Sequence, residues 1–154
     1  MIDTPQILQT VALPAAVIHL TIPRSKMMQE FGPAVGELLS ELATQGIVPL
    51  SAAFAHHLKM TPDEFDFELG FVVDAPVTAS GRVQPGELPA GKVARTIYHG
   101  PYEGLPQAWG EFVKWMGAQG LKQADDLWEL YFHGPQSDPD PKTWKTELNR
   151  PLVD

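Results

Sequence analysis

The chain contains no cysteine among its 154 residues. This absence excludes disulfide bonds, a cysteine nucleophile and thiolate zinc sites. The sequence also lacks any apolar run near the roughly 20 residues needed to span a bilayer. Its start, Met-Ile-Asp-Thr-Pro, lacks the basic and apolar regions of a signal peptide. We therefore expect a cytoplasmic protein with no membrane partner.

Positive charge is also scarce. Eleven Lys and Arg residues stand against 19 Asp and Glu, the formal net charge is -8, and the basic residues are scattered. Without a basic stripe to neutralise phosphates, direct nucleic-acid binding is not expected. The sequence has no Gly-rich phosphate loop and no Gly-x-Ser-x-Gly elbow, so classical enzyme signatures are absent and we expect no cofactor.

The five histidines do not form a metal-binding pattern. His56 and His57 are adjacent on a predicted strand, so their side chains point to opposite faces and cannot chelate one ion together. The other three, His19, His99 and His133, show no ligand spacing. We expect no metal site, and a haem held by one histidine has no support in the sequence.

What the sequence does contain is an internal repeat. Residues 36–47 (GELLSELATQGI) reappear as residues 110–121 (GEFVKWMGAQGL), and shorter echoes keep the same order. Two copies are too few for a solenoid. Two independent cores of about 75 residues would each be marginal, so we expect one domain over residues 1–154. Its pseudo-repeats, about 6–74 and 81–152, should enclose a central cleft at a pseudo-twofold axis.

Each half reads as β-α-β-β. The first half is expected to contain strands 6–13 and 15–22, then a helix that ends at Gly46, and strands 47–58 and 64–73. The apolar positions of this helix run from Met27 to Leu42, and Pro33 indicates either that its regular part begins near there or that its first turns are kinked. Residues 74–87 form the expected connector. The second half should contain strand 91–98, helix 105–118, and strands 126–133 and 143–149, with a stiff loop at 136–141. The order predicts an α+β fold, in which both helices cover one side of a curved, mainly antiparallel sheet.

The two halves differ at one carboxylate. Matching them pairs Phe54 with Tyr131 and Ala52 with Glu129, the only acid in residues 127–133. A carboxylate among apolar neighbours needs a raised pKa, a buried partner or a cationic ligand. The alternative is an edge strand from which Glu129 points to water.

In a cleft, Glu129 would supply charge between flat aromatic walls. The candidate wall residues are Tyr131, Trp109, Tyr102, Phe54 and Phe112. Such a site suits an amphipathic cation or a planar aromatic molecule. Each aromatic side chain on its own is also explained as ordinary core, and the turn at residues 99–102 is also explained as a chain reversal before the helix.

Four segments in a fixed order carry a resemblance to a known family: Leu-Pro-Ala at residues 88–90, Tyr-His-Gly-Pro-Tyr at 98–102, Trp-Glu-Leu-Tyr at 128–131, and Thr-Glu-Leu at 146–148 before Pro-Leu at 151–152. They resemble the GyrI-like small-molecule-binding family, which includes effector-binding domains of AraC-type and MerR-type multidrug-sensing regulators. The resemblance implies a tandem β-α-β-β (SHS2-like) fold. It also gives Glu129 the role of the pocket glutamate that pairs with lipophilic cations, with Tyr131, Tyr102 and Trp109 as wall positions.

We expect no helix-turn-helix before residue 6 or after residue 149, which would distinguish the chain from those regulators. Three functions stay open. The first is a stand-alone binder of lipophilic cationic or planar aromatic compounds. The second, also known among relatives, is a hydrolase of cyclopropane-bearing toxins, with Glu129 as general base and Tyr102 or Tyr131 as proton donor. The third is a gyrase-inhibitor-like module that binds a protein partner through exposed acids.

Overall fold

The computed structural model describes residues 2–133 and 140–153, which form two compact units. The first unit is Val11–Ala90, and the second unit combines Met1–Thr10 with Gly91–Asp154. The loop expected at residues 136–141 falls mostly outside the described residues.

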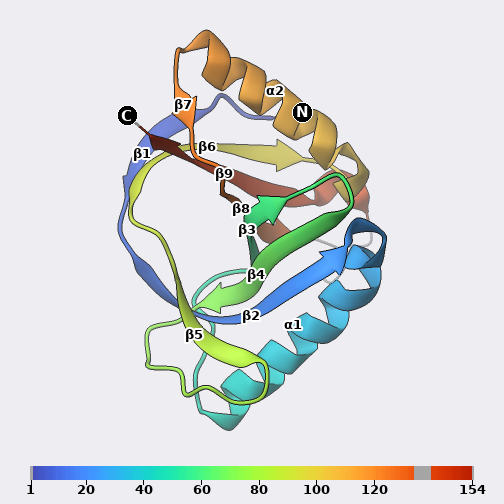
Figure 1. The fold of residues 1–154 in the computed structure, drawn as a ribbon, viewed down its shortest axis with the longest axis vertical. Helices are drawn as coiled ribbons and strands as arrows, with labels where there is room; N and C mark the ends of the chain where they lie inside the picture. Colours follow the sequence, from blue (N-terminus) through green and yellow to red (C-terminus); the bar gives the residue numbers. More distant parts are fainter. Residues whose placement is uncertain (1, 134–139, 154) are drawn as a thin grey trace. The chain divides into compact units, whose positions relative to one another are not determined.

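The first unit is an antiparallel sheet with one helix. Its strands follow the order β3-β4-β2-β5, and α1 runs beside β2 and β4 (Figure 1). The helix ends before Gly46, whose φ of 70° favours glycine, as the sequence predicts. The elements are β2 (Leu13–Pro23), α1 (Met27–Thr44), β3 (Phe54–Met60), β4 (Glu64–Val72) and β5 (Val83–Leu88).

The second unit repeats this plan. Its sheet has the order β1-β6-β9-β8, all antiparallel, and the short strand β7 pairs with β9. The elements are β1 (Gln6–Thr10), β6 (Gly91–His99), α2 (Leu105–Ala118), β7 (Lys122–Gln123), β8 (Leu127–His133) and β9 (Lys145–Val153). The α+β class, the antiparallel pairing and the helix at 105–118 are therefore confirmed.

Several expected boundaries are wrong. The strand expected at residues 6–13 ends at Thr10, and the strand expected at 143–149 is Lys145–Val153. The strand expected from residue 47 begins only at Phe54, because the chain first makes a connection that includes Pro49 and whose Leu50 N–H donates to the Val72 carbonyl. The expected connector contains a strand, β5, despite its Pro85 and Gly86. This strand lies at the sheet edge, where proline is tolerated, and a Cβ on Gly86 would lie 2.9 Å from a Val17 methyl group.

The compact units do not coincide with the contiguous pseudo-repeats. Strand β1 precedes the first repeat's long strand, yet it pairs with β6 of the second repeat. Strand β5 precedes the second repeat's long strand, yet it pairs with β2 of the first. Each repeat therefore contributes its first short strand to the sheet that the other repeat builds.

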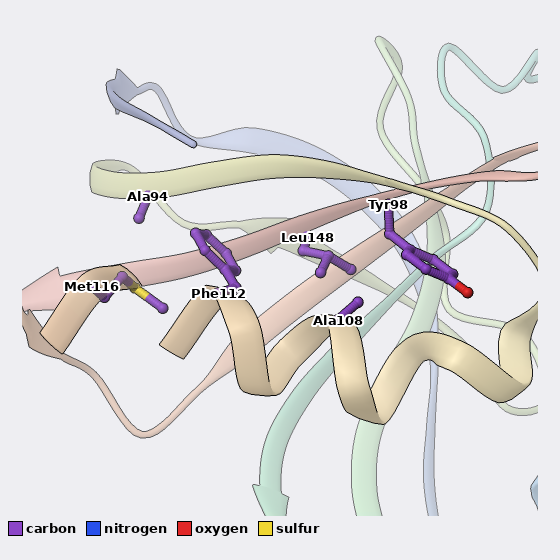
Figure 2. Packing of buried hydrophobic residues seen from close by; sticks show 6 residues of the cluster. All are labelled: Ala94, Tyr98, Ala108, Phe112, Met116 and Leu148. Atoms are coloured by element: carbon purple, nitrogen blue, oxygen red, sulfur yellow. The ribbon is translucent and has the colours of Figure 1, made fainter. Parts of the chain in front are cut away.

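The core of the second unit lies between its sheet and α2. Figure 2 shows Ala94, Tyr98 and Leu148 on the strands facing three residues of the helix. Those helical residues are Ala108, Phe112 and Met116, spaced four apart as one buried stripe requires. This face of the sheet is therefore the one that α2 covers.

No described helix has both the length and the apolar character that a membrane crossing requires. Within the same residues, no group of three or more His, Asp or Glu side chains is placed to hold a metal ion.

Candidate functional site

Glu129 lies in the middle of β8 and faces α2. Its cross-strand partner is Leu148 of β9, and directly paired residues share a face of the sheet. Because Leu148 packs on α2, Glu129 points toward the helix as well. Glu129 is 7% exposed. The alternative of a carboxylate pointing to water from an edge strand is therefore wrong.

Both carboxylate oxygens of Glu129 accept a hydrogen bond from a neutral donor. The Trp109 indole Nε1–H donates to Oε2 at 2.6 Å, and the Tyr131 hydroxyl donates to Oε1 at 2.7 Å. No basic side chain in residues 2–133 or 140–153 forms an ion pair with Glu129. The charge of Glu129 is thus supported by dipoles, without an internal countercharge.

Burial is the largest influence on the pKa values of Glu129 and Tyr131. It raises the pKa of Glu129, while the hydrogen bonds from Trp109 and Tyr131 act in the opposite direction. Burial, followed by the negative charge of Glu129, raises the pKa of Tyr131 well above its usual value. Tyr131 therefore keeps its proton at neutral pH and remains the donor.

Other aromatic rings extend the site from Tyr131. The Tyr102 ring lies edge-on to Tyr131, with centroids 5.8 Å apart, and 5.0 Å from the Trp144 ring. Trp109 packs against Phe112 at 5.6 Å. Phe112 is fully buried in the core, so it supports Trp109 from behind rather than forming a wall. Sequence reasoning missed Trp144, whose only signal is a tryptophan just before the 146–148 motif.

The turn before α2 places Tyr102. The Tyr98 hydroxyl donates to the Pro101 carbonyl at 2.8 Å, and Gly100 has a φ of 139°. A Cβ on Gly104 would lie 2.0 Å from the same hydroxyl. The backbone conformation and close packing of this turn therefore explain why glycine occupies positions 100 and 104. The same turn holds Tyr102 beside Tyr131.

Phe54 belongs to the first compact unit, and its role as a wall of the site stays a prediction. Phe54 lies in the core of this unit, is 1% exposed and packs on Gly70, where a Cβ would lie 2.8 Å from its ring. Phe54 is therefore also explained as an ordinary core residue.

The strand ladders also correct how the halves correspond. In the β3–β4 hairpin Ala55 pairs with Leu69, as Glu129 pairs with Leu148 in the β8–β9 hairpin. Because Phe67-Glu68-Leu69 is echoed by Thr146-Glu147-Leu148, Leu69 matches Leu148, and the counterpart of Glu129 is Ala55, not Ala52. By the same ladders His57 corresponds to Tyr131. The contrast between glutamate and alanine survives, although sequence echoes alone misplace it.

A family model decides what kind of domain this is. The GyrI-like small molecule binding domain matches residues 3–152, almost the whole chain. The chain belongs to the GyrI-like family. No curated protein sequence gives a significant match.

Solved structures agree with this GyrI-like fold. The EcmrR C-terminal domain matches with a TM-score of 0.85 at 17% identity, covering 98% of each chain. EcmrR in its complex with DNA matches with a TM-score of 0.84 at 18% identity, over 98% of this chain. The match covers 57% of that EcmrR chain, so this chain spans a little over half of its length.

Two further structures are similar to this chain. A hydrolase from Listeria innocua matches at TM-score 0.70 and 14% identity, covering 97% of this chain and 91% of that one. SAV2435 bound to tetraphenylphosphonium matches at TM-score 0.65 and 15% sequence identity, and the match covers 98% of this chain and 94% of SAV2435. At these identities the likeness establishes the fold alone.

Proposed function

We propose that this chain binds lipophilic or planar aromatic cations at Glu129. The observation that carries the proposal is a buried carboxylate whose two hydrogen bonds come from neutral groups, Trp109 and Tyr131. A buried charge destabilises the folded chain unless it is paired. A ligand cation would supply the missing countercharge.

The rings around Glu129 suit the apolar part of such a ligand. Trp109, Tyr131, Tyr102 and Trp144 are all partly exposed, so this cluster reaches the surface of the unit. A cation over an aromatic face gains about 0.5–2 kcal/mol per ring. Charge and rings together favour a bulky, weakly hydrated cation over a small hydrated ion.

The family and one relative support this ligand class. GyrI-like domains are small-molecule-binding domains, and a structure of SAV2435 has been solved bound to tetraphenylphosphonium, a lipophilic cation. In this chain the corresponding charge would come from Glu129.

The test is a tryptophan-fluorescence titration of wild type and Glu129→Gln with tetraphenylphosphonium and the neutral triphenylphosphine oxide. The Gln variant keeps the shape: its oxygen can accept from Trp109 and its amide can donate to Tyr131. At an effective dielectric constant of about 20, unit charges about 6–11 Å apart attract by about 1.5–3 kcal/mol, so the cation should bind roughly 10- to 150-fold more weakly. The affinity for the neutral compound should change little. Equal losses for both compounds would contradict the proposal.

A second candidate function is hydrolysis of a strained electrophile. The observation that favours it is the short contact between Glu129 and Tyr131, in which burial raises the pKa of the carboxylate toward that of a useful general base. Glu129 would take a proton from water, and the resulting oxygen nucleophile would open a cyclopropane C–C bond. A tyrosine, Tyr131 or Tyr102, would protonate the carbon that receives the electron pair.

Mass spectrometry distinguishes the two functions. An activated cyclopropane incubated with wild type would gain one water if the chain is a hydrolase, and Glu129→Gln would abolish that gain. Saturable binding of the same compound without product would establish the binder instead.

A further inference from the structure

Thr146 is a buried residue of the Glu129 face that sequence reasoning did not single out for the site. It is fully buried, and its Oγ1 has no hydrogen-bond partner among the described residues. It pairs directly with Tyr131 across β8 and β9, so it lies on the face that carries Glu129. A buried hydroxyl without a partner destabilises the folded chain, and such a group asks for an explanation.

The first unit shows what fills the corresponding place there. Phe67 pairs with His57 as Thr146 pairs with Tyr131. The Phe67 ring stacks on the His57 ring, with centroids 5.1 Å apart and planes 30° apart. In the second unit a short side chain with a hydroxyl stands where the first unit has this stacked ring.

We propose that Thr146 determines which cations the site prefers. A planar ring of the ligand would lie against Tyr131 in the place that Phe67 takes against His57, and a polar group on that ring would hydrogen-bond to Thr146. The ligand class is then a planar aromatic cation with an amine or hydroxyl on the ring. This inference rests on the proposed function, because Glu129 supplies the charge.

Ligand entry involves Tyr102. Thr146 has no exposure of its own, whereas Tyr102 and Tyr131 are both partly exposed. The Tyr102 ring meets Tyr131 edge-on, and Tyr102 is the first residue of the one-turn 3₁₀ helix Tyr102–Gly104. Because Tyr102 lies on this turn and not on a strand, we expect that rotation of its ring would uncover the Tyr131 face for a ligand.

The test compares two phenanthridinium dyes by fluorescence titration: 3,8-diamino-N-methylphenanthridinium and N-methylphenanthridinium, which lacks the amines. Thr146→Val removes the hydroxyl and keeps the side-chain shape. Because one neutral hydrogen bond is lost, the affinity for the diamino dye should fall by about five- to tenfold, and the affinity for the amine-free dye should fall by less than about twofold. Equal loss for both dyes, or no loss for either, would overturn the inference.

Thr146→Phe tests the same idea by filling the place with a ring, as the first unit does. The Thr146→Phe variant should bind neither dye and should still unfold cooperatively. A folded variant that binds both dyes would count against the inference. If this variant does not fold, Thr146→Val decides. Glu129→Gln separates this inference from the proposed function. Dye binding that needs Glu129 but ignores Thr146→Val refutes the inference alone, whereas binding indifferent to Glu129→Gln refutes the proposed function.

Discussion

The hairpins β3–β4 and β8–β9 share one backbone plan and carry different chemistry. Where β8 has Glu129 and Tyr131, β3 has Ala55 and His57. The first hairpin fills its helix-facing surface with rings, since His57 packs between Phe67 at 5.1 Å and Phe65 at 5.1 Å. The second places a carboxylate there and surrounds it with donors.

This difference separates scaffold from site within a duplicated fold. A strand position that accepts alanine in one copy does not need a charge to fold. The glutamate in the other copy therefore carries a cost that its donors only partly offset. Donors from both β8 and α2 reach it, because Tyr131 shares its strand and Trp109 comes from the helix. The proposed function assigns the carboxylate to binding, and the ring-filled counterpart is the matching position to compare with it.

Copying the charge into the other hairpin should have the largest effect. In Ala55→Glu the new carboxylate would face α1, where the position matching Trp109 in the sequence repeat is Val35. An uncompensated buried charge costs about 3–5 kcal/mol. Chemical denaturation at pH 8 should show this loss relative to Ala55→Gln, which matches the volume without the charge. Equal stability of the two variants would show that Ala55 tolerates charge and would break the comparison.

The neutral histidine of the first hairpin predicts an acid-sensitive fold. Burial, with smaller contributions from His56 and Arg24, lowers the pKa of His57 from 6.5 to about 4. The unfolded chain binds this proton more tightly, so the stability is fully present above pH 6.5 and is lost as pH falls toward 4. The loss should reach about 3 kcal/mol.

The measurement is the unfolding free energy of wild type and His57→Phe between pH 7 and pH 4. The Phe variant should lose much less stability over this range. His99→Asn, at an exposed histidine, serves as the control and should follow wild type. Parallel curves for wild type and His57→Phe would show that His57 does not titrate as described.

Removing the helix donor should have a smaller effect. Trp109→Phe keeps a ring against Phe112 but removes the N–H from Glu129, and a hydrogen bond to a charged group contributes about 1.5–3 kcal/mol. The loss should be greater at pH 8 than at pH 4, because protonation of Glu129 weakens the bond that is lost. Trp115→Phe, on the same helix, is the matched control. A pH-independent loss equal to that of the control would mean that the N–H does not support the charge.

Much of this arrangement follows from local sequence pattern. The spacing of apolar residues located α2, and the apolar neighbours of Glu129 indicated that its carboxylate would be buried. The β1 and β5 pairings could not be predicted in this way, because short strands carry little local signal and their partners lie far along the chain. The sequence echoes also could not predict the register of the hairpins, because the links between their strands differ in length. Four residues lie between the paired residues Met60 of β3 and Phe65 of β4, whereas the link between β8 and β9 is much longer.

The most direct test of the central claim is the pH dependence of tetraphenylphosphonium affinity in wild type and Glu129→Gln. Because burial raises the pKa of Glu129, wild-type affinity should fall as pH decreases through a range above that of an exposed glutamate, at about 4.3. The Gln variant should bind weakly at every pH, with a flat profile. A flat wild-type profile, or one that the Gln variant shares, would contradict the assignment of Glu129 as the charge that receives the cation.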